Sequence, residues 1–161
     1  MKNSLLFLFF LVFGFTAMAQ TPTDTSADTL SQKQKEVIQP IEQLFEGMLK
    51  GDSSMIRKAF YKKPILRTIV ANKKTDEQLV ESKLEDFLST IATPHEKAYI
   101  EKILSYDIKI DGNLAQVWTP YKFYVGDTFS HCGVNAFHLM QTEEGWKIIG
   151  ITDTRRREAC E

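Results

Sequence analysis

Residues 115–156, AQVWTPYKFYVGDTFSHCGVNAFHLMQTEEGWKIIGITDTRR, decide the fold because they alternate between apolar and polar side chains. With the residues just upstream they make four strand-like runs, at 99–110, 115–125, 131–142 and 146–156. The runs are separated by turn signals at Asp111-Gly112-Asn113, Gly126-Asp127 and Glu143-Glu144-Gly145. Because connections this short join neighbouring strands, we predict an antiparallel sheet.

Upstream of the strands the apolar period is helical. Residues 37–49 place their apolar side chains on one face, and Gly51 ends the pattern. Pro40 lacks an N–H and is harmless only in a first turn, so we predict that the regular helix starts between residues 36 and 39.

Two shorter helices are predicted before the strands. One covers residues 53–60, and the other follows a capping box in which Ser82 precedes Glu85 by three residues. Helices that precede an antiparallel sheet predict an α+β domain. A twisted sheet of four to six strands over three helices should leave a cavity between the two layers.

The N-terminus has the pattern of a secretory signal. Lys2 precedes an apolar run at 5–15, and Ala17-Met18-Ala19 predicts cleavage after Ala19. The apolar run is shorter than the ~20 residues that a spanning helix needs, so we expect no membrane span in the mature form. We therefore expect a periplasmic or secreted protein with a signal peptide at 1–19, a flexible leader at 20–30 and one domain at 31–161.

Composition excludes several classes of function. The chain has 161 residues and a net charge of -1, so it lacks the strongly basic surface expected of a nucleic-acid-binding domain. It contains no phosphate-binding glycine loop, paired CxxC or HExxH motif, and its three histidines fit no zinc signature. We expect no metal and no cofactor.

Three polar residues are candidates for chemistry. His131 opens a strand, and an imidazole can exchange a proton near neutral pH. Asp153 and Arg155 are two apart on the last strand, so both project from one face. They could orient a polar ligand inside a cavity, or they could form an ion pair that only tethers the sheet. His131 and Asp153 are the candidate general bases.

The aromatic residues of one strand divide between its faces. Tyr121 and Phe123 share one face, whereas Trp118 and Tyr124 share the other, and alternation does not say which face is inward. These side chains either fill the core or line a pocket for an aromatic or heterocyclic ligand. The candidate ligand-binding residues are Trp118, Tyr121, Tyr124, His131, Asp153 and Arg155.

The two cysteines can be placed from the last hairpin. A turn at 143–145 puts Cys132 opposite Arg157, three residues before Cys160. One curl of the C-terminal tail then brings the two sulfurs within disulfide reach. An oxidising compartment permits a Cys132–Cys160 disulfide, and a catalytic thiol is the alternative.

From residue 38 to the C-terminus the chain resembles the nuclear transport factor 2-like (SnoaL-like) superfamily, and most of all its exported bacterial branch called putative lumazine-binding. The resemblance rests on Ile110-Asp111-Gly112, Ala115-Gln116-Val117-Trp118, Pro120-Tyr121, His131-Cys132-Gly133, Phe137, Gly145-Trp146-Lys147-Ile148 and Asp153-Thr154-Arg155. It implies a cone-shaped, cystatin-like α+β domain whose curved antiparallel sheet wraps around the N-terminal helices and a pocket. It also implies a homodimer formed through the outer sheet face.

Three functions remain open at this level. The first is a small-ligand-binding domain with an aromatic-lined pocket. The second is a SnoaL-like isomerase, cyclase or hydrolase that uses His131 or Asp153 as general base. The third is a protein-interaction module that acts through the outer sheet face. An open cavity would favour the first two, whereas a blocked cavity and an exposed apolar patch would favour the third.

Overall fold

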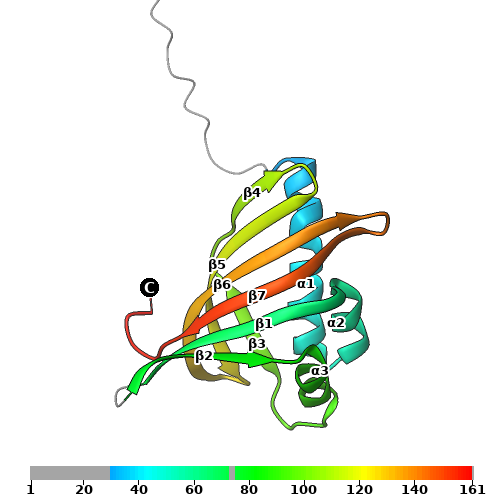
Figure 1. Cartoon of the computed structure of the whole chain (residues 1–161). Coiled ribbons are helices and arrows are strands. Elements are labelled where there is room, and N and C mark those ends of the chain that lie inside the picture. The colour runs from blue at the N-terminus through cyan, green and yellow to red at the C-terminus, as the bar shows by residue number, and fades with distance from the viewer. Residues whose placement is uncertain (1–29, 73–74, 161) are drawn as a thin grey trace, which may run out of the picture.

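A curved sheet lies across a long helix in the computed structural model, which describes residues 30–72 and 75–160 (Figure 1). The predicted signal peptide and nearly all of the predicted leader lie outside the described residues. The elements are α1 (Gln32–Lys50), α2 (Ser53–Ala59), β1 (Phe60–Asn72), β2 (Thr75–Ser82), α3 (Leu84–Ala92), β3 (Tyr99–Ile103), β4 (Asp107–Asp111), β5 (Leu114–Val125), β6 (Thr128–Thr142) and β7 (Gly145–Arg155). The α+β class is confirmed.

Helix α1 starts earlier than its proline suggests. Ser31 Oγ accepts a hydrogen bond from the Gln34 N–H, and the Gln34 side chain accepts one from the Ser31 N–H. This capping box starts the helix at Gln32, so the predicted start at 36–39 is wrong. Pro40 lies inside the helix and is buried, at the cost of one main-chain hydrogen bond. Gly51 ends α1 at φ 68°.

The start of α3 also differs from the prediction. Ser82 is the last residue of β2, and the N-cap position belongs to Lys83, which makes no side-chain capping bond. The predicted Ser82–Glu85 capping box is therefore wrong. Glu85 and Asp86 instead place two carboxylates in the first turn, where the helix dipole favours negative charge.

The sheet contains a hairpin that the sequence analysis did not predict. β1 and β2 pair antiparallel, and β1 also pairs in parallel with β7, so the predicted wholly antiparallel sheet is in fact mixed. The strand order is β2-β1-β7-β6-β5-β3, with β4 also paired to β5. The single run predicted at 99–110 is two strands, β3 and β4, and both pair with β5. All three predicted turns are present.

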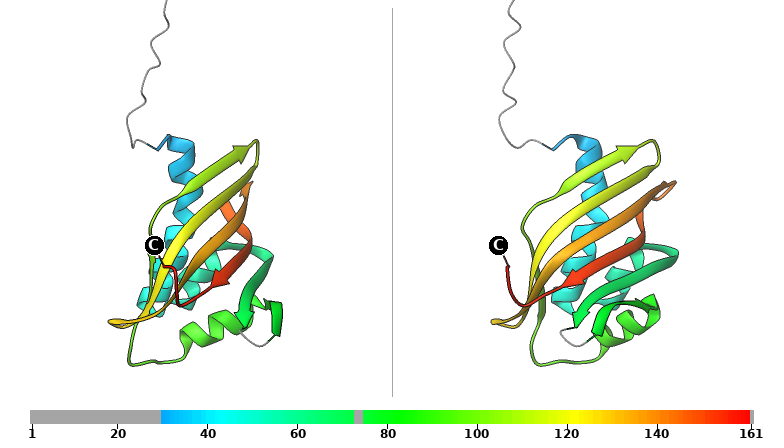
Figure 2. Two further views of the ribbon diagram at one scale, coloured as in Figure 1. Left: turned by 90° about the vertical axis from the view of Figure 1, so that its left-hand side faces the viewer. Right: turned by 60° about the vertical axis from the view of Figure 1, so that its left-hand side comes forward.

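The main core lies between α1 and the concave face of the sheet. Figure 2 shows from two further directions that the helices lie on this one face. Apolar side chains of α1 pack against the inward residues of the sheet: Val37, Ile41, Leu44, Met48, Val117, Phe137, Leu139 and Ile148. Each such burial stabilises the fold by ~1.5–3 kcal/mol. In the described part of the chain, no helix is long and apolar enough to cross a membrane.

Candidate functional site

A cavity of about 430 Å³, partly open to solvent, lies between the sheet and the helices. Most of its lining is apolar and comes from both layers, with Phe45, Met48, Leu66, Phe87, Phe137 and Ile151 as examples. Polar side chains of β1, β3, β5, β6 and β7 also reach it. The volume falls within the range of natural small-molecule pockets, ~300–1,000 Å³.

Asp153 is the best-connected polar group of the cavity. The parallel pairing of β1 with β7 sets Thr68 beside Asp153, and Thr68 Oγ1 donates to Asp153 Oδ1 at 2.6 Å. Arg155 Nε donates to Asp153 Oδ2 at 2.8 Å, and the Tyr121 hydroxyl lies 3.4 Å from the same oxygen. Asp153 is 8% exposed. The predicted Asp153–Arg155 pair therefore exists and lines the cavity, while Asp153 itself already accepts from three side chains.

Tyr121 is held by close packing of two strands. Its hydroxyl also lies 3.0 Å from the Thr154 carbonyl oxygen, which accepts from it. Gly133, opposite Tyr121, allows this approach, because a Cβ there would lie 1.8 Å from the Thr154 oxygen and 3.0 Å from Tyr121 Cε1. Burial, and then the Asp153 charge, raise the pKa of Tyr121 well above its ordinary value. The phenol is therefore a protonated donor at neutral pH.

Glu101 is a further polar group of the cavity that was not predicted from the sequence. This residue of β3 lies opposite Phe123, and its Oε1 accepts from Asn135 Nδ2 at 2.6 Å. Burial raises the pKa of Glu101 to about 7; the Asp153 charge acts in the same direction, and the Asn135 hydrogen bond opposes both. Glu101 is thus a carboxyl group that can exchange a proton near neutral pH. Its signal in the sequence was a charged residue in the inward phase of the 99–110 run.

His131 lines the same cavity from β6. Ser130 Oγ lies 3.0 Å from its Nδ1, and its ring packs against Phe123 and, edge-on, against Tyr121. Burial, followed by the Arg155 charge, lowers the pKa of His131 from its ordinary value. At neutral pH the side chain is therefore an uncharged imidazole.

Two aromatic candidates lie outside the cavity. Tyr121 is inward and 2% exposed, whereas Trp118 is 48% exposed on the other face of β5. Tyr124 is not among the cavity-lining residues either; its ring contacts Phe129 and lies under Lys102 Nζ. The expectation that Trp118 and Tyr124 contact a ligand in this cavity is wrong, because the side chains of β5 that point inward are those in phase with Thr119 and Tyr121.

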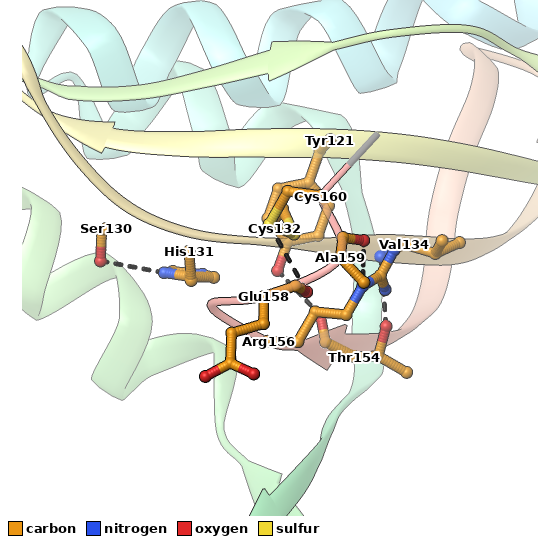
Figure 3. The surroundings of a disulfide bond; sticks show 10 residues. All are labelled: Tyr121, Ser130, His131, Cys132, Val134, Thr154, Arg156, Glu158, Ala159 and Cys160. Atoms are coloured by element: carbon orange, nitrogen blue, oxygen red, sulfur yellow. Dashed lines mark hydrogen bonds between the residues drawn. A yellow bond between two sulfur atoms is a disulfide. The ribbon is translucent and has the colours of Figure 1, made fainter.

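The cysteines form the expected disulfide beside this site (Figure 3). Cys132 and Cys160 are joined with a Cα–Cα distance of 5.8 Å, and neither thiol is free. Cys132 pairs with Arg156 rather than with the predicted Arg157, because the turn is tighter than predicted and Thr142 lies opposite Gly145. The register shift between His138 and Leu139 recovers only one of the two positions. The bond ties the C-terminal tail to the strand that carries His131.

The described residues contain no group of three or more His, Cys, Asp or Glu side chains that could hold a metal ion.

Comparisons with known proteins agree with this architecture. The model of a family described as putative lumazine-binding matches residues 32–152. A nuclear transport factor 2-like protein of unknown function from Shewanella baltica is 16% identical, with a TM-score of 0.59 over 82% of this chain and 100% of that one. A putative dehydratase of the same superfamily from Streptomyces avermitilis is 12% identical, with a TM-score of 0.57 over 76% and 94% of the chains.

A third structure, a nuclear transport factor 2-like protein with a cystatin-like fold from Novosphingobium aromaticivorans, is 11% identical. Its TM-score is 0.59 over 79% of this chain and 84% of that one. At these identities the likeness shows the fold alone. The comparison with curated proteins found no match.

Proposed function

Because the chain belongs to the putative lumazine-binding family of nuclear transport factor 2-like proteins, we propose that it is an exported protein that binds a small, partly apolar ligand in its cavity. One observation carries the proposal: a cavity of about 430 Å³ whose apolar walls meet a cluster of polar side chains. Apolar walls supply affinity and a few placed polar groups supply orientation, which is the usual design of a ligand pocket.

One further observation is compatible with export. Disulfides such as Cys132–Cys160 form and persist mainly in oxidising compartments. Mass spectrometry of the mature protein, isolated from its native host, tests the proposed cleavage after Ala19.

Ligand binding is tested with prodan, an uncharged naphthalene dye whose fluorescence shifts in apolar surroundings. We expect saturable binding to the wild type and its loss in Ile151→Trp, which fills the cavity from β7. Thr152→Trp is the matched control, because the neighbouring residue projects from the opposite face of the same strand. Equal binding by both variants, or none by the wild type, would refute a ligand-binding cavity.

A proton-transfer enzyme of the SnoaL-like type is the second candidate. It is favoured by Glu101, whose pKa of about 7 suits a group that takes and returns a proton at neutral pH. Exchange of the methyl protons of acetophenone in D₂O, followed by NMR, measures such chemistry without knowledge of the natural substrate. Faster exchange with the wild type than with Glu101→Gln supports catalysis, and equal rates argue against it.

The outer sheet face is the third candidate, as a surface for a homodimer or another partner. Trp118 and Leu114 are exposed there, at 48% and 53%. Light scattering of the wild type and Trp118→Lys tests this role. A wild-type dimer that dissociates in the variant supports it, and a wild-type monomer removes the homodimer.

A further inference from the structure

Two acceptor oxygens of cavity-lining residues have no protein donor among the described residues. Glu101 Oε1 takes a hydrogen from Asn135 Nδ2, but Glu101 Oε2 has no hydrogen-bond partner among the described residues. The Asn135 amide directs its NH₂ to Glu101 and Thr119, which leaves Asn135 Oδ1 without a donor within the same residues. Asn135 is only 6% exposed. In a poorly hydrated cavity, an acceptor without a protein donor favours a ligand that donates a hydrogen bond to it.

The neighbouring Asp153 carboxylate, by contrast, already has protein donors. Both Asp153 oxygens accept from protein donors, and the charge of Arg155 balances that of Asp153. The Arg155 side chain is 52% exposed, so its remaining N–H groups can be solvated. The Asp153 oxygens therefore have protein donors, whereas Glu101 Oε2 and Asn135 Oδ1 are left to accept from a ligand.

We propose that Glu101 and Asn135 receive an amino group, so that the cavity selects ligands with an amine at the end of a largely apolar body. This inference rests on the proposed ligand-binding function and names the chemical class of its ligand. An ammonium group offers three donors, enough for Glu101 Oε2 and Asn135 Oδ1 together.

A cationic ligand and an anionic ligand should have opposite effects on the protonation of Glu101. The other titratable or charged groups that line the cavity are Arg67 on β1, Asp86 on α3, Tyr99 on β3, Tyr121 on β5, His131 on β6, and Asp153 and Arg155 on β7. Near pH 7 the Glu101 carboxyl is partly protonated. An arriving ammonium drives Glu101 to ionise and release its proton, whereas an arriving carboxylate holds the proton and draws more in.

The test uses tryptamine and indole-3-propionate, which share a ring and a two-carbon linker and differ in the charge of the end group. Isothermal titration at pH 7 in two buffers of different ionisation enthalpy measures both affinity and protons exchanged. We expect tryptamine to bind at least about tenfold more tightly, because its ammonium group can donate hydrogen bonds to a charged carboxylate and indole-3-propionate cannot. We also expect a fraction of a proton to be released per tryptamine bound.

Two variants assign the effect to Glu101. Glu101→Gln keeps the shape but not the charge, and it should abolish both the tryptamine preference and the proton release. Glu96→Gln, an exposed glutamate outside the cavity lining, should retain both.

Equal affinities, a preference for indole-3-propionate, proton uptake with tryptamine, or a preference that survives Glu101→Gln would each overturn the inference. If neither indole binds while prodan does, amine selection fails and the ligand-binding function stands. If prodan also fails to bind, the proposed function itself falls.

Discussion

Glu101 should make the folded protein less stable as the pH rises through neutrality. Its carboxyl has a pKa of about 7 in the folded state and an ordinary value of 4.5. Between these values the folded state keeps a proton that the unfolded state has lost, so the free energy of unfolding falls with rising pH. The contribution is fully present below pH 4.5 and is gone above about pH 7.

The magnitude follows from the width of that interval. About 2.5 pH units separate the two values, and each unit corresponds to ~1.36 kcal/mol, so the loss is about 3 kcal/mol. Glu101→Gln has no titrating carboxyl and should escape this loss. The variant should therefore gain about 3 kcal/mol over the wild type between pH 4.5 and pH 8.

Urea unfolding of both proteins at pH 4.5, 5.5, 6.5, 7.5 and 8.5, with the disulfide kept oxidised, measures this difference. Glu96→Gln, which replaces an exposed carboxyl, should give a curve parallel to the wild type. A constant gap between the wild type and Glu101→Gln across the pH range would refute the reasoning, because it would place the Glu101 carboxyl in contact with bulk water.

Three further predictions concern the surroundings of the site. Gly133→Ala should lower the free energy of unfolding by at least ~1–3 kcal/mol in urea titrations, because its Cβ would collide with the Thr154 carbonyl oxygen; an unchanged midpoint would contradict the close strand approach. Tyr121→Phe should lower the free energy of unfolding by ~1–2 kcal/mol, because the Thr154 and Asp153 oxygens lose the hydroxyl that donates to both. Thermal melts that match the wild type would contradict this prediction and would mean that water replaces the hydroxyl without cost. Cys160→Ser should lose ~3 kcal/mol, because the disulfide spans 28 residues; reductant should lower the melting temperature of the wild type but not of this variant, and insensitivity of both proteins would contradict the bond.

Local patterns predicted most of the second half of the fold. The turns at Gly112, Gly126 and Gly145 are present because these glycines adopt positive φ, which other residues adopt at a cost. The disulfide was also predictable, since a hairpin fixes which residues are near one another to within about one position.

The β1–β2 hairpin escaped prediction for physical reasons. β1 contains two lysines and a proline, and β2 is an edge strand that contains Asp76, Glu77 and Glu81, so neither shows a clean apolar alternation. Their strand conformation depends on β7, which pairs with β1 from about 85 residues further along the chain. No local window of sequence contains that partner.

The sequence by itself determined the α+β class, the hairpins that join β4 through β7 and the residue types available for chemistry, because these depend on periodicity and turn chemistry over short distances. Only the tertiary structure decided that Tyr121 faces inward and Trp118 outward, since the register of β5 against β6 and the side covered by α1 set that choice. The tertiary structure also decided the pKa of Glu101, because the pKa of a carboxyl depends on its burial and its neighbours. Two of those neighbours, Asn135 and Asp153, come from strands far along the chain.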